Sequence, residues 1–331
     1  MKRLKQAGIA CMLLLLLVMG SSWGFLVHRT THQLAVYELP NEVQGFFYRH
    51  LDYLVKNAPR PDTRRSEDST EATKHFIDIE YYGKDAENTM PVTWDAAVAK
   101  YTKDSLLKYG HLPYVIVDMK TKLTHAFATA NEDSILFYAA DLGHYIGDAN
   151  VPLHTSINYD GQLSNQKGLH ALWESMIPEI EIEQFNLYGN HTATYLADPT
   201  AAVWKAIRRS YALVPDVFAK ELEVSKQFTE AQKFRIQMRK GKEVKYYTTE
   251  FAKAYAASLH NTINEQLVNT SNMIADFWYT CWVDGGKPNL DKVFNTSLTP
   301  AETERLKAET ESYQKNTLIK DGYLISKKKE Q

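Results

Sequence analysis

Apolar residues recur at helical spacing along the long segments of this chain, and this periodicity constrains the fold more than any other feature. The segments 135–146, 201–222 and 251–282 place apolar side chains three and four positions apart, so each can turn one apolar face toward a core. No convincing run of alternating apolar and polar residues indicates a strand. The sequence therefore predicts an all-α fold, a compact multi-helix domain.

The amino terminus has the pattern of a secretory signal peptide. Three basic residues among the first five precede an apolar run from 9 to 19, and the small residues 20–22 form a cleavage site. The apolar run is too short to span a bilayer comfortably. We expect cleavage near Ser22, so that residues 1–22 are removed and Trp23 begins an exported protein, periplasmic or extracellular.

Charge and cysteine content narrow the function classes. The formal net charge is −2, and loss of the basic signal residues makes the mature chain more acidic. We therefore expect no extended basic surface for nucleic acid, although a local positive cleft remains compatible with this balance. Cys281 is the only cysteine expected in the mature chain, which excludes an internal disulfide there. The basic segment 235–245 is expected to be a solvated turn between helices.

Histidines and carboxylates fall into two patterned pairs. His144 and Asp148 are four residues apart, and on a helix that spacing places both side chains on one face. A Pro-Leu-His turn then presents His154. His170 and Glu174 repeat the four-residue spacing. One such pair is commonly a surface or capping pair, but two pairs within 31 residues of an exported chain indicate a metal centre.

The expected mature amino terminus adds ligands to this centre. A free α-amine on Trp23 and its carbonyl oxygen can chelate one ion, with His28 as the next ligand. Upstream of the pairs, Asp62 lies in a proline-flanked loop and His75 opens a His-Phe-Ile-Asp run. Imidazole and carboxylate ligands without thiolate are typical of catalytic zinc sites, which keep a position open for water.

These motifs resemble the superfamily that joins bacterial zinc-dependent phospholipase C to the fungal and plant single-strand-specific nucleases. The resemblance runs from Trp23 to about Glu179 and implies a zinc phosphodiesterase domain over 23–290. The charged residues that follow Pro300 predict a polar carboxy-terminal helix and tail over 291–331. The resemblance also implies a cleft with three Zn²⁺ ions. One ion would take Asp62, His75, His144 and Asp148; a second, bridged by Asp148, would take Trp23 and His28; the third would take His154, His170 and Glu174.

The resemblance also suggests residues for the chemistry. Asp62 and Arg65 are the catalytic candidates, because the nucleases carry an arginine near the phosphate, and a guanidinium fork suits the charge that develops there. A salt bridge within a charged loop is the alternative for Arg65. The expected hydrogen-bond partners of the zinc-bound imidazoles are Asp141 or Asp78.

Substrate contacts are expected on both sides of the ligand motifs. Phe76 can support a base or an acyl chain, and in the nucleases an Asp at the place of Asp78 lies near the bound base. The loop between the two ligand pairs contributes Asn158, Tyr159 and Asn165. Ordinary core packing for Phe76 and a simple polar loop for the other three are the alternatives.

Three functions stay open on the sequence. Three features favour a nuclease acting on single-stranded nucleic acid: the five-residue step between Trp23 and His28, the presence of Arg65, and Trp173 before the last ligand. Glu174 and the Pro-Leu-His-Thr loop favour a phospholipase C that cleaves phospholipid head groups. A non-catalytic zinc-binding protein is the third possibility. No feature implies a stable protein partner, and a monomer is expected.

Overall fold

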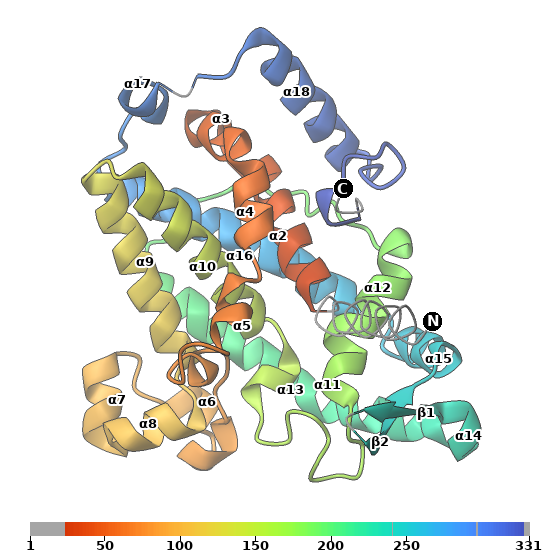
Figure 1. The fold of residues 1–331 in the computed structure, drawn as a ribbon. Helices are drawn as coiled ribbons and strands as arrows, with labels where there is room; N and C mark the ends of the chain where they lie inside the picture. The colour runs from red at the N-terminus through yellow and green to blue at the C-terminus, as the bar shows by residue number, and fades with distance from the viewer. Residues whose placement is uncertain (1–23, 240, 296, 328–331) are drawn as a thin grey trace, which may run out of the picture.

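The computed structural model describes residues 24–239, 241–295 and 297–327 (Figure 1). Trp23 and the expected signal peptide lie outside the described residues. The structure is 68% helical, which confirms the all-α class. Among the described residues, no helix has both the length and the apolar character needed to cross a membrane.

The helices follow one another closely, with short turns between most of them. The α-helices are α2 (Phe25–Glu38), α3 (Asn41–Arg49), α4 (Leu51–Asn57), α5 (Arg60–Arg64), α6 (Ala86–Thr89), α7 (Trp94–Tyr101), α8 (Lys103–Tyr109), α9 (Leu112–Ala128), α10 (Glu132–Ala149), α11 (Leu169–Ala171), α12 (Ile177–Glu181), α13 (Pro199–Ser225), α14 (Glu230–Lys233), α15 (Thr249–Ser258), α16 (Thr262–Asp284), α17 (Leu290–Phe294) and α18 (Pro300–Gln314). The single turns are the 3₁₀ helices η1 (Ala72–Lys74), η2 (Ile79–Tyr82), η3 (Pro152–Thr155), η5 (Ile182–Gln184) and η6 (Ile325–Lys327), and the π-helical turn η4 (Leu172–Met176).

Helix α10 lies at the centre of the main core. It packs against α2, α4, α9, α13 and α16, and Figure 1 shows these helices crossing around it. From Ala139 to Ala149 every residue of α10 is buried, including Asp141, His144 and Asp148. Burying polar groups in a helix interior is costly unless they have partners. Asp141, His144 and Asp148 must therefore have partners at the centre of the fold that offset the cost of burying them.

A β-hairpin interrupts the helical pattern between α14 and α15. Strands β1 (Phe234–Arg239) and β2 (Lys242–Tyr247) pair antiparallel, so the expectation of a solvated turn without strands was wrong. Phe234 and Tyr247 form a directly opposed pair, with ring centroids 4.8 Å apart. Opposed residues share one face of a hairpin, and this aromatic pair anchors it to a second, smaller core.

The carboxy-terminal segment packs onto the main core through α18 and the turns that follow it. Tyr313 is buried and its hydroxyl donates to the Glu38 carboxylate at 2.6 Å. Leu318 and Leu324 are buried in the same core as the central helices. A capping box of Thr299 and Glu302 begins α18. The polar helix expected in this region is thus present, with an apolar attachment to α2.

Candidate metal centre

All the predicted ligands that the structure describes lie in three neighbouring groups. In each group, the potential ligand atoms lie within 4.8 Å of one another. Segments far apart in the sequence supply these ligands. They are α2, α5, the residue that ends η1, α10, η3, α11 and η4. The groups are His28, His144 and Asp148; Asp62, His75 and His144; and His154, His170 and Glu174.

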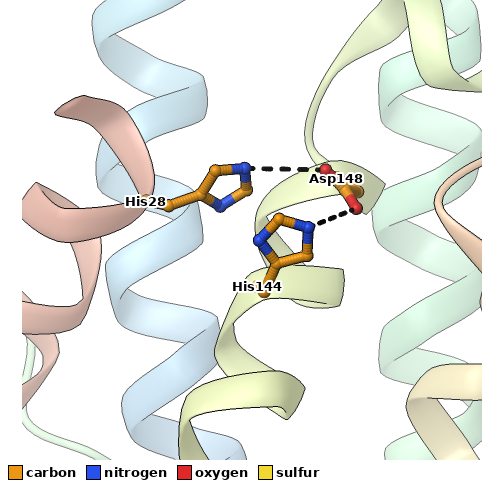
Figure 2. A group of neighbouring side chains, drawn as sticks. All are labelled: His28, His144 and Asp148. Atoms are coloured by element: carbon orange, nitrogen blue, oxygen red, sulfur yellow. Dashed lines mark ion pairs between the residues drawn. The ribbon is translucent and has the colours of Figure 1, made fainter. Parts of the chain in front are cut away.

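Asp148 lies between the first two groups. Its Oδ1 is 3.7 Å from His28 Nε2, and its Oδ2 is 3.3 Å from His144 Nε2 and 2.9 Å from His75 Nδ1. Figure 2 shows the two carboxylate oxygens turned toward different histidines. The His28 and His144 rings are stacked, with centroids 4.0 Å apart. One carboxylate oxygen therefore faces each of two potential ion positions, as a bridging ligand requires.

Asp62 completes the second group from a helix rather than from a loop. The sequence suggested a proline-flanked loop, but Pro61 occupies the first turn of the short helix α5, where its missing N–H has no intrahelical acceptor to lose. Asp62 Oδ1 lies 3.7 Å from His75 Nδ1 and 4.0 Å from His144 Nε2. Asp62 is 27% exposed, whereas Asp148 is 2% exposed, so solvent reaches only Asp62 of these two carboxylates.

The third group is the most compact. Glu174 Oε2 is 2.6 Å from His170 Nε2 and 3.2 Å from His154 Nε2, and the two Nε2 atoms are 3.0 Å apart. His170 and Glu174 share a face through their four-residue spacing, although Glu174 lies on the π-helical turn η4. Such turns are rare and occur often at functional sites.

The hydrogen bonds behind the histidines direct their lone pairs into these groups. His144 Nδ1 donates to the Ala58 carbonyl oxygen at 2.9 Å, and His154 Nδ1 donates to the His75 carbonyl oxygen at 2.6 Å. A carbonyl oxygen only accepts, so in the neutral imidazole each Nε2 carries a lone pair. His28 Nδ1 is buried and has no hydrogen-bond partner among the described residues. This set of nitrogen and oxygen donors fits zinc.

The expected partners of these imidazoles were wrong. Asp141 accepts instead from Arg60 at 2.6 Å and from Arg64 at 2.9 Å, and the Nδ1 atoms of His144 and His154 donate to the carbonyl oxygens of Ala58 and His75 rather than to Asp78. For His144 and His154, backbone carbonyls take the role that was expected of carboxylates. A main-chain carbonyl has no signature in the residue types, which is why the sequence did not point to it.

The electrostatics of the groups call for a cation. Burial, with a smaller contribution from His144, lowers the pKa of His28 to about 4. Burial also opposes protonation of His144 and His154, but the neighbouring carboxylates together outweigh it: Asp148 with Asp62 raises the pKa of His144 to about 9, and Asp148 with Glu174 raises the pKa of His154 to about 9. The same contacts hold the pKa of Asp148 well below its usual value in spite of burial. A dication would replace these protons, so its binding should be pH-dependent.

Two glycines of α10 allow α2 to bring His28 this close. A Cβ at Gly147 would lie 2.8 Å from His28 Nδ1, and one at Gly143 would lie 2.4 Å from His32 Nε2. His32 is buried, with Nδ1 2.7 Å from the His28 carbonyl oxygen and Nε2 3.0 Å from the Ala140 carbonyl oxygen. Neither these glycines nor His32 were among the predicted functional residues, although Gly143 and Gly147, like His28 and His32, have the same four-residue spacing as the ligands.

Arg65 and the segment after His75 lie beside the second group. Arg65 Nη1 is 3.5 Å from Asp62 Oδ1, and its side chain is 49% exposed. Phe76 is half-buried and its ring lies against Gly110, where a Cβ would be 2.6 Å from Phe76 Cδ2. Burial, with a smaller effect from Glu80, raises the pKa of the Asp78 carboxyl to about 7. The Ile77 N–H donates to the His154 carbonyl oxygen, which ties this segment to the third group.

The three residues expected on the loop divide into two roles. Tyr159 is exposed, and its ring centroid is 6.3 Å from that of His170, so it borders the third group. The Asn158 side chain accepts from Leu163 N at 2.8 Å and donates to Ser164 Oγ at 3.0 Å, which shapes the loop. Asn165 is exposed and has a left-handed backbone with φ 59°. Only Tyr159 of the three has a described contact with a predicted ligand.

Comparison with known families agrees with this geometry. The model of the S1/P1 nuclease family matches residues 23–278, a stretch that begins at Trp23 and contains every predicted ligand. A comparison with curated proteins gave no match. The family is zinc-dependent and hydrolyses phosphodiesters, so the nuclease interpretation is favoured over the phospholipase one. The match extends over more than half of the chain, and this protein belongs to the S1/P1 nuclease family.

Proposed function

We propose that this protein is an exported, monomeric phosphodiesterase that cleaves single-stranded nucleic acid at a centre of three zinc ions. The observation that carries the proposal is the arrangement of three donor groups around Asp148, each with lone pairs directed inward. Zinc bound at such a centre supplies an activated water and stabilises negative charge on phosphate oxygens. His28, His75, His144, Asp62 and Asp148 would hold two ions, with Trp23; His154, His170 and Glu174 would hold the third.

The solvent-accessible residues of the site have separate roles in this proposal. The exposed guanidinium of Arg65 binds a phosphate oxygen and holds the phosphorus beside Asp62. Asp62 accepts the proton of the attacking water, because solvent reaches its carboxylate, whereas the Asp148 carboxylate is buried. The attacking oxygen then bonds to phosphorus as the bond to the leaving oxygen breaks, and the leaving oxygen takes a proton from solvent, so no covalent enzyme intermediate is needed.

Phe76 and Asp78 support a nucleobase rather than an acyl chain as the neighbouring group. A base offers a flat face for the Phe76 ring and N–H groups for the Asp78 carboxyl. An acyl chain would leave that carboxyl, half-buried beside Phe76, without a hydrogen-bond partner, which costs free energy. Tyr159 offers a second exposed ring on the side of the third group.

The export part of the proposal rests on the amino-terminal pattern and on the start of the family match at residue 23. The amine that cleavage would free is the one that can bind the ion beside His28. A cytoplasmic precursor would then have an incomplete centre, which would keep a nuclease inactive until it leaves the cell.

The test is a substrate panel on the mature protein beginning at Trp23. We expect hydrolysis of single-stranded DNA to exceed that of duplex DNA and of phosphatidylcholine, to stop with a chelator and to return with Zn²⁺. His170→Ala should abolish the activity, whereas His125→Ala, at an exposed histidine on α9, should not. Faster cleavage of phosphatidylcholine would replace the nuclease with a phospholipase, and activity that survives zinc removal would exclude the metal mechanism.

A further inference from the structure

A buried carboxylate lies behind His75, on the side away from the proposed ions. Glu71 is 0% exposed, and its Oε1 lies 3.6 Å from His75 Nε2, a distance just longer than a hydrogen bond. His75 Nε2 is itself buried and has no hydrogen-bond partner in the part of the chain that the structure describes. The other ring nitrogen, His75 Nδ1, faces Asp148 at 2.9 Å and Asp62 at 3.7 Å. The His75 ring thus lies between the Glu71 carboxylate, which faces Nε2, and the proposed metal ligands Asp148 and Asp62, which face Nδ1.

The Glu71 carboxylate is held in this position by several donors. Arg64 Nε lies 3.0 Å from Oε2 and Arg64 Nη2 lies 3.2 Å from Oε1, while Lys74 Nζ lies 2.7 Å from Oε2. The Tyr145 hydroxyl also donates to Oε1. Arg64 in turn binds Asp141 of α10 at 2.9 Å. Both oxygens are therefore fixed, and Glu71 cannot turn away from His75 without losing charged partners.

We propose that Glu71 is a positioning residue for the metal centre: its carboxylate accepts the Nε2–H of His75 and leaves the Nδ1 lone pair for zinc. A neutral imidazole has one N–H, and the hydrogen bond at one nitrogen decides which nitrogen stays free to bind a metal. Carboxylate partners of this kind also increase the basicity of the ligand. The inference rests on the proposed zinc centre and gives His75 a carboxylate where His144 and His154 have carbonyls.

The burial of Glu71 excludes contact with substrate, so its effect must pass through His75. The competing role is purely structural, a tie between α5, η1 and α10 through Arg64 and Tyr145. The two roles differ in what they predict for zinc affinity. A structural tie would weaken the whole fold, whereas a positioning carboxylate would weaken zinc binding only while His75 is present.

The experiment compares Glu71→Gln with Glu309→Gln in the mature full-length protein. Glu309 is a matched control, since it is 2% exposed and accepts from Tyr37 and Arg305 much as Glu71 accepts from Tyr145 and Arg64. Zinc affinity is measured by competition with a chromogenic chelator, and folding by circular dichroism of the zinc-free protein. We expect Glu71→Gln to lower the affinity for one of the zinc ions by about 10–100-fold and Glu309→Gln to leave all the affinities unchanged.

A double-mutant cycle with His75→Ala separates the two roles. If Glu71 acts through His75, adding Glu71→Gln to His75→Ala changes the zinc affinity no further. An equal loss with and without His75, or a Glu71→Gln affinity within about twofold of wild type, overturns the proposal. If Glu71→Gln does not fold, Glu71→Asp decides: it keeps the charge but withdraws the carboxylate from His75 by one methylene, and an unchanged zinc affinity would then overturn the positioning role.

Failure of this inference differs from failure of the proposed function. A wild-type protein that binds no zinc contradicts the metal centre itself. A wild-type protein that binds zinc and cleaves single-stranded DNA, together with an equally tight Glu71→Gln, contradicts only the role of Glu71.

Discussion

Replacing Gly147 by alanine should destabilise the protein and displace His28 from the centre. Alanine in place of glycine at an unstrained helical position normally stabilises a protein, by about 0.4–1 kcal/mol. At Gly147 the added Cβ would lie 2.8 Å from His28 Nδ1 and 2.9 Å from His28 Cε1. Optimal contacts between carbon atoms are about 3.5–4.0 Å. The added methyl group therefore overlaps the ring of a predicted ligand.

His28 has little room to move away from that methyl group. Its side chain is 4% exposed, and its ring is stacked on His144 at 4.0 Å. Adding a methylene to a well-packed core typically costs about 1–3 kcal/mol. We therefore expect Gly147→Ala to lower the free energy of unfolding of the zinc-free protein by about that amount. The loaded protein should also lose the ion beside His28.

Gly45→Ala on α3 is the matched control. The nearest atom to an added Cβ there is the Leu298 side chain at 3.8 Å, an ordinary contact, so this variant should gain about 0.4–1 kcal/mol. Urea unfolding of both zinc-free variants and elemental analysis of both loaded variants give the comparison. If Gly147→Ala is stabilised as much as Gly45→Ala and keeps its full zinc content, the close approach of α2 to α10 does not position His28.

Three further predictions concern the centre and its substrate. Asp148→Asn should lower the zinc content, measured by elemental analysis, more than His28→Ala does, because Asp148 faces two groups; equal losses would contradict bridging. The Asp78 carboxyl, with its pKa raised to about 7 by burial and by Glu80, is neutral below that pH and becomes an acceptor for base N–H groups above it, so KM for single-stranded DNA should fall as the pH rises through about 7. Asp78→Asn should lack that change, and the same pH profile in the variant would exclude Asp78 from base binding. A Gly-Ser extension before Trp23 should weaken one zinc site and reduce turnover, since a peptide nitrogen is a poor ligand; full activity of the extended protein would remove Trp23 from the centre.

The sequence could point to the residues that gather in the three groups because their chemistry and spacing are local properties. His144 and Asp148 share a face of α10 and His170 lies beside Glu174, as the four-residue spacing requires. Asp62 depended on the resemblance, and the structure places it with His75. The helical class followed from the long apolar periodicities, which the segments 132–149 and 199–225 retain as single helices.

Other features depend on long-range contacts that spacing does not encode. The Ala58 carbonyl oxygen accepts from His144, 86 residues later in the chain. This contact forms only because the turn before α5 packs on α10. The hairpin was missed because each strand is six residues long and the basic residues in it are typical of solvated turns. Glu71 did have a local signal, since it precedes His75 by the same four residues that join the recognised pairs.

The most direct test of the central claim is a zinc titration of activity. The mature protein is stripped with a chelator, and its rate of single-stranded DNA hydrolysis is followed as Zn²⁺ is added back in known equivalents per chain. Three donor groups around Asp148 predict an activity that rises until close to three equivalents are bound and then stays constant. Full activity without zinc, or a plateau at one equivalent or fewer, would contradict the account.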